Sequence, residues 1–115
     1  MSNQETINKA NAENFKWGTA CDGWHLLKSD ELSIVEEIMP PGSEGVVHHH
    51  EVSRHFFYIL EGEASLVIEG TTHVLNRGDS ILVLPGKVHQ IKNESGSELN
   101  FLVVSSPECF TDKHS

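Results

Sequence analysis

Residues 42–62 read GSEGVVHHHEVSRHFFYILEG, and this stretch decides how the rest of the chain is interpreted. Three of its histidines, His48, His50 and His55, lie within eight residues, and its second half is aromatic and β-branched. A fourth histidine, His89, follows far downstream, beside a glycine turn. Imidazole is the commonest protein ligand of transition metals, so four imidazoles with this spacing predict a single metal centre.

The spacing of the first three histidines fits β-strands. Side chains alternate between the two faces of a strand, so His48 and His50 point to one side while His49 points to the other. The two imidazoles are then about 7 Å apart along the backbone and can converge on one ion. His55 begins the next strand and shares an apolar-lined face with Phe57. Burying several polar groups on such a face costs free energy unless each has a binding partner, and a metal ion can be the partner of all of them.

The other four histidines have no second histidine on the same face of a predicted strand. We expect surface or structural roles for them rather than metal binding; they are His25, His49, His73 and His114. A lone buried histidine is usually a hydrogen-bonded part of a core.

Turns recur along the chain at roughly ten-residue intervals, and no helical periodicity lasts for more than two turns. This pattern predicts an all-β sandwich or barrel. We expect strands over residues 32–38, 55–60, 64–69, 71–75, 81–84, 88–92 and 99–104, with a hairpin turn at Gly70. Residues 1–14 are polar and aperiodic, so we expect a flexible segment there, or an arm that docks on a partner. Residues 15–115 form one domain in this interpretation.

Charge and composition restrict the function. The chain of 115 residues carries 17 acidic residues against 8 Lys and Arg, a formal charge of −9. This charge opposes binding to nucleic acid and to anionic membranes. No apolar stretch approaches the roughly 20 residues needed to span a bilayer, and the N-terminus lacks the apolar core of a signal peptide, so we expect a cytoplasmic protein. Cys21 and Cys109 are expected to be free thiols rather than a disulfide.

Two gapped motifs carry a resemblance to a known family. The first consists of Gly42, five residues, His48-x-His50, four residues, His55, six residues and Gly62; the second consists of Gly78, Pro85-Gly86, two residues, His89, three residues and Asn93. In spacing and order they resemble the two motifs of the cupins, and the sequence is similar to small single-domain cupins over residues 42–93. The resemblance implies a double-stranded β-helix, or jelly-roll barrel, with a metal inside near one mouth. It also implies a homodimer, with exchange of N-terminal strands as one form, and tight turns with positive φ at Gly62, Gly78 and Gly86.

The sequence departs from the cupin pattern at two positions. Leu84 stands where proline is frequent, a minor change because Pro85 follows. His55 stands where the first motif usually carries a glutamate. Four neutral imidazoles leave a divalent ion with its full +2 charge, so we expect a small, anionic, chelating ligand that neutralises it. The cofactor is expected to be one divalent transition metal per chain, with Fe, Ni, Zn, Cu and Mn as candidates. In an alternative, His55 is a flexible ligand and leaves a three-histidine site with open positions.

Apolar side chains on the strands of the histidines are expected to line the cavity and contact the ligand; these are Phe57, Ile59, Ile91 and Phe101. Tyr58 should point away from them. Trp17 and Trp24 either cap the barrel or lie in a dimer interface. No general base stands out beyond the four histidines, which favours metal-centred chemistry.

Three functions fit these features. The first is a metal-dependent enzyme of the dioxygenase, isomerase or lyase type that acts on a small anionic metabolite. The second is a non-catalytic module that binds a small molecule or a metal. The third is a structural role in which the metal ties strands together. Metal identity and an accessible coordination position would distinguish the three.

Overall fold

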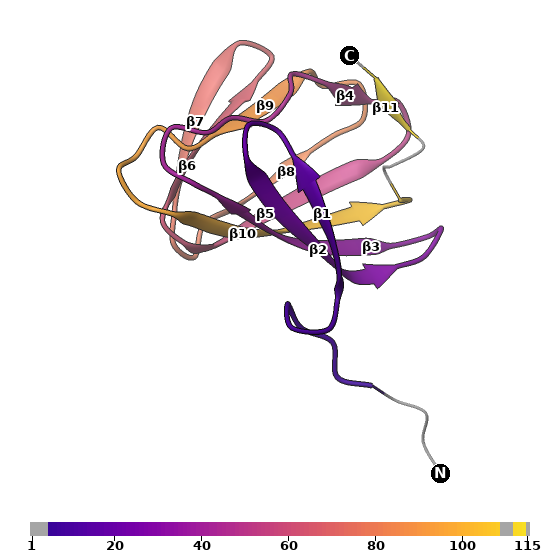
Figure 1. Ribbon diagram of the computed structural model, residues 1–115. Helices are drawn as coiled ribbons and strands as arrows, with labels where there is room; N and C mark the ends of the chain where they lie inside the picture. The colour runs from indigo at the N-terminus through magenta and orange to yellow at the C-terminus, as the bar shows by residue number, and fades with distance from the viewer. Residues whose placement is uncertain (1–4, 109–111, 115) are drawn as a thin grey trace.

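The strands of this chain form a barrel from two facing sheets, as the computed structural model in Figure 1 shows for residues 5–108 and 112–114. Cys21 is a free and buried thiol, as expected. Cys109, the other cysteine expected to be free, lies outside the described residues. Within the described residues no helix is long and apolar enough to span a bilayer.

The large sheet has the strand order β1-β2-β3-β10-β5-β8. Its strands are β1 (Glu13–Trp17), β2 (Cys21–Lys28), β3 (Ser33–Met39), β10 (Leu99–Ser106), β5 (Arg54–Glu61) and β8 (Ser80–Val83). A second sheet has the order β7-β6-β9, with β7 (Thr71–Asn76), β6 (Glu63–Ile68) and β9 (His89–Lys92). A short pair joins β11 (Lys113–His114) to β4 (His49–His50). Neighbouring strands pair antiparallel throughout. The predicted all-β jelly-roll barrel is confirmed, and the seven expected strands lie within two residues of their expected bounds.

The core lies between the two sheets because both present one apolar face. Along β5 the burial alternates strictly, with Phe57 and Ile59 buried and Phe56 and Tyr58 exposed. Side chains from the second sheet, such as Leu66 of β6, belong to the same buried cluster. Alternation of this kind follows from the two-residue period of a strand that has one buried face.

The inward-facing side chains of the large sheet lie in rows across the strands, because the register of β5, β10 and β3 is continuous there. The histidine row contains His55, Ser105 and Ser33. The apolar row, two residues further along, contains Phe57, Val103 and Val35. The Glu37 row follows after two more residues and contains Ile59, Phe101 and Glu37.

Turns between strands show the backbone geometry that the sequence predicts. Gly62, Gly78 and Gly86 have positive φ, as expected, and the β6–β7 hairpin turns at Glu69 and Gly70, which both have positive φ. Gly62 has a steric reason as well, because a Cβ at this position would lie 2.6 Å from the carbonyl oxygen of Glu98. Paired positive φ values are typical of tight hairpins whose twist matches that of the flanking strands.

Candidate metal centre

The four histidines predicted from the spacing lie together inside the barrel. One ring nitrogen from each of His48, His50, His55 and His89 lies within 4.8 Å of the others. His50, His55 and His89 are buried, with 3%, 6% and 3% exposure, and His48 is half-buried. Ring centroids are 4.0 Å apart for His50 and His55 and 4.4 Å apart for His48 and His89. The four residues are therefore positioned to hold a metal ion.

The histidines reach the cluster from three places in the barrel. His48 and His89 lie opposite one another in an isolated antiparallel bridge, and their backbones exchange hydrogen bonds of 3.0 and 2.9 Å. His50 belongs to β4, and His55 is held in β5 between Ser105 of β10 and Val83 of β8. His49 lies between two of these residues in sequence but stacks on His114, with ring centroids 5.3 Å apart. The alternation of faces along a strand accounts for this separation.

Backbone carbonyls fix the tautomer of three of the rings. Nδ1 of His48 donates to the carbonyl of Val46 at 2.7 Å, and Nδ1 of His89 donates to that of Lys87 at 2.9 Å. Nδ1 of His50 donates to the carbonyl of Asp112 at 3.0 Å. A carbonyl oxygen only accepts, so the proton of the neutral ring is on Nδ1 and the lone pair is on Nε2. This arrangement orients a histidine for metal binding, and the donor set fits a transition metal.

Asp112 holds the loop that follows His50. Its carboxylate accepts hydrogen bonds from the backbone N–H groups of Val52 at 2.7 Å, Ser53 at 2.8 Å and Glu51 at 3.3 Å. These donors stabilise the charged form, chiefly those of Ser53 and Val52, and they lower the pKa of Asp112 to about 2. The carboxylate is therefore ionised at neutral pH. β11 pairs with β4 beside it, so residues 112–114 form part of the support of His50.

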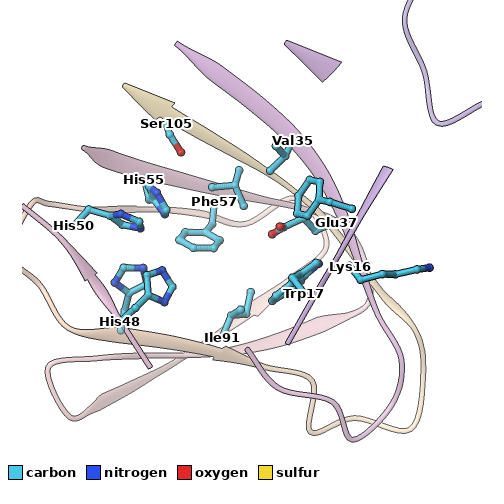
Figure 2. Close-up of a pocket in the computed structure, with 13 residues that line it drawn as sticks. Lys16, Trp17, Val35, Glu37, His48, His50, His55, Phe57, Ile91 and Ser105 are labelled. Atoms are coloured by element: carbon cyan, nitrogen blue, oxygen red, sulfur yellow. The ribbon is translucent and has the colours of Figure 1, made fainter. Parts of the chain in front are cut away.

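A cavity of about 260 Å³ opens from the histidines. Its apolar walls are Phe15, Trp17, Val35, Phe57, Ile91 and Val103, and its other polar lining residues are Lys16, Glu37 and Ser105. Figure 2 shows the histidines on one side of Phe57 and Glu37 on the other, with Trp17 at the Glu37 end and Ile91 between the two ends.

Of the four apolar residues expected to line the cavity, Phe57 and Ile91 do so. Ile59 and Phe101 do not belong to its walls; both are completely buried. They lie in the Glu37 row, where the rings of Trp17 and Phe101 pack nearly perpendicular to one another with centroids 6.2 Å apart. Trp17 itself lines the cavity. Its Nε1 donates a hydrogen bond to the carbonyl of Asp22 at 2.9 Å.

Glu37 is a carboxylate that the sequence analysis did not single out, and it lines the same cavity as the histidines. The signal lay in β3, whose inward positions are Ser33, Val35, Glu37 and Met39. A charged residue at an inward position of an alternating strand is unusual, because burying a charge is costly. Phe15 and Trp17 were also missed as lining residues. Their strand, β1, has five residues and alternates only over Phe15, Lys16 and Trp17, which is too short a pattern to predict a strand.

The chain is similar to a known protein family and to individual proteins of that kind. The model of the Cupin domain family matches residues 35–105 of the chain. The oxalate-binding protein of Thermotoga maritima is 35% identical over 85 residues, which cover 70% of this chain and 70% of that protein. The pectin degradation protein KdgF of Dickeya dadantii is 31% identical over 72 residues, which cover 62% of this chain and 66% of that protein.

A solved structure shows the same architecture over almost the whole chain. An RmlC-like cupin from Shewanella frigidimarina superposes with a TM-score of 0.82 at 25% identity, and the match covers 94% of this chain and 95% of the other. The matches span 66% to 70% of the length of these curated relatives.

Proposed function

This chain belongs to the cupin domain family, and from the geometry of its four histidines we propose that it is a metal-dependent enzyme of the dioxygenase, isomerase or lyase type. One divalent transition metal is bound by Nε2 of His48, His50 and His89, with His55 as the fourth ligand. The carbonyl partners of the three Nδ1 atoms carry the proposal, because they leave the metal-binding nitrogen of each ring with its lone pair. Bound there, the metal supplies a Lewis acid for a chelating substrate.

The substrate is a small anionic chelator, because the protein contributes no negative ligand to the cluster. Four neutral imidazoles leave the charge of the ion uncompensated in a largely apolar cavity, where charge is poorly solvated. An anionic oxygen donor on the substrate offsets it. Phe57, Val35 and Val103 exclude water beside the cluster, and Glu37 is the carboxylate that can accept or return a proton in the same cavity.

The second candidate is a non-catalytic binding module, and one similarity favours it: the relative from Thermotoga maritima is named for binding oxalate. The homodimer and the cytoplasmic location expected from the sequence remain proposals that accompany either function.

Metal content tests the site first. We expect near one equivalent of a first-row transition metal per chain in untagged protein, measured by elemental mass spectrometry. The variant His89→Ala should lose it, whereas His49→Ala should retain it because His49 stacks outside the cluster. Retention of metal by His89→Ala would contradict the assignment.

Ligand binding and turnover test the chemistry. Cobalt(II)-loaded protein should change its visible spectrum on addition of oxalate or of a 2-oxo acid, and unchanged spectra would rule out the chelating substrate. A metal-loaded protein that binds such anions but converts none of them in oxygen-consumption, lyase and isomerase screens would favour the binding module.

A further inference from the structure

The cavity has two polar ends separated by an apolar belt. The histidine cluster lies at one end and Glu37 at the other, with the apolar row of Phe57, Val103 and Val35 between them. The register places the Glu37 row four residues from the histidine row, because Ser105 pairs with Ser33 and Phe101 pairs with Glu37. Four residues of strand correspond to about 13 Å along the sheet before the side chains reach inward. Figure 2 shows the same order, from His50 past Phe57 to Glu37.

A glycine beside Glu37 makes room for an aromatic ring. Glu37 pairs with Gly23 of β2, which pairs in turn with Phe15 of β1. A Cβ on Gly23 would lie 2.3 Å from the Phe15 ring, so the missing side chain is what lets this ring lie over the strand. Phe15 and Glu37 both line the cavity, and the carboxylate therefore stands beside an aromatic ring at its far end.

We propose that Glu37 is the specificity-determining residue of this cavity: the ligand carries a chelating anionic head at the histidines, an apolar middle, and a hydrogen-bond-donating or cationic end at Glu37. The inference rests on the proposed function for the head and goes beyond it for the far end. A charged carboxylate binds a donor or a cation well and repels a second negative group. Ligands with a carboxylate at both ends, separated by a chain long enough to reach Glu37, are therefore excluded.

Matched chelators test this directly. Three hydroxamates with the same chain of five methylene groups, ending in an ammonium, a methyl or a carboxylate group, are titrated into cobalt(II)-loaded protein and followed by its visible spectrum. Acetohydroxamate, which has the head alone, serves as the fourth probe. The wild type should bind the ammonium-ended probe about 10- to 100-fold more tightly than the carboxylate-ended one, the range expected of a charge-assisted hydrogen bond.

Variants at neighbouring positions assign the effect to one side chain. Glu37→Gln should reduce the preference to near unity while acetohydroxamate binds as before, and Glu37→Asp should keep its direction. Glu36→Gln is the matched control, because Glu36 lies on the opposite face of β3 and pairs with Lys9 at 3.4 Å. The control should retain the wild-type preference.

The outcomes separate this inference from the proposed function. Equal affinities of the three long probes in the wild type would overturn the role of Glu37, whatever the folding of the variants, and so would an unchanged preference in folded Glu37→Gln. If acetohydroxamate itself fails to bind the metal-loaded protein, the chelating head and hence the proposed function are wrong, and the inference that rests on it falls too.

Discussion

Replacing Asp112 by alanine should weaken metal binding although residue 112 contributes no ligand atom. The carboxylate accepts three backbone N–H groups of residues 51–53, and this attachment keeps the carbonyl of the same residue 3.0 Å from Nδ1 of His50. In Asp112→Ala that carbonyl is no longer held in place, so the ring of His50 loses both its orientation and its preference for the Nδ1–H tautomer.

The expected loss of metal affinity in Asp112→Ala follows from the two histidines that keep their carbonyl partners. His48 and His89 keep their own carbonyl partners, at Val46 and Lys87, so one of three anchored ligands is released. Loss of such an outer partner costs about 10- to 100-fold in metal affinity. We therefore expect the Kd for zinc to rise by that factor, and by less in Asp112→Asn, which retains one acceptor oxygen.

Two measurements check this expectation. Competition with a chromophoric chelator gives the zinc Kd, and long-range proton–nitrogen NMR of the metal-free protein gives the tautomer of each histidine. In Asp112→Ala, only His50 should become a mixture of tautomers. Glu51→Ala is the control, because the exposed Glu51 side chain follows His50 directly and only its backbone N–H contacts Asp112. Wild-type zinc affinity in Asp112→Ala, or a zinc Kd raised equally in Glu51→Ala, would refute the reasoning.

Three further predictions concern the barrel itself. Burial raises the pKa of the Cys21 thiol above 9.0, so in a Cys109→Ser background the native protein should alkylate far more slowly than the unfolded chain. The folded thiol holds its proton more tightly, so its contribution to stability is intact below pH 9.0 and should be lost above it, as denaturant titrations across alkaline pH would show. Gly62→Ala should lower the free energy of unfolding by about 1–3 kcal/mol from its positive φ alone, with the Glu98 contact adding to this in thermal melts. Ile59→Ala should cost about 2–5 kcal/mol in urea unfolding, because the side chain is completely buried; a loss below 1 kcal/mol would contradict its place in the core.

The strands that the sequence predicts are those with one buried face. Over β5 and β10 the alternation of burial is regular, and the two-residue period is visible without knowledge of the partners. β1 and β2 were not predicted because β1 has only two apolar residues, Phe15 and Trp17, and because Gly23 occupies a buried position of β2 while the large Trp24 lies on the other face. The position of β10 between β3 and β5 depends on pairing between residues far apart in the chain, which no local pattern contains.

The same distinction applies to the site. The histidines were predictable because three of them are close in sequence and the strand period tells which of them share a face. Asp112, Phe15 and Trp17 come from the two ends of the chain, and their roles arise only once these ends pack against the barrel. For Glu37, the alternation along β3 predicts the inward position, but no local pattern predicts which residues lie near it in the cavity.

The closeness of His48, His50 and His55 in sequence also affects the unfolded chain. Within eight residues it still offers three imidazoles, so a metal ion that binds the native site would also have affinity for the unfolded chain. The stability that the metal adds to the fold is then set by the ratio of its two affinities, and it is smaller than the native affinity alone implies. His89 and the Asp112 carbonyl account for the difference between the two affinities, because both are far in sequence from the first three histidines and only folding brings them close. A metal ion held by the first three histidines in the unfolded chain would gain its fourth ligand only when β9 pairs with β6 and brings His89 to them.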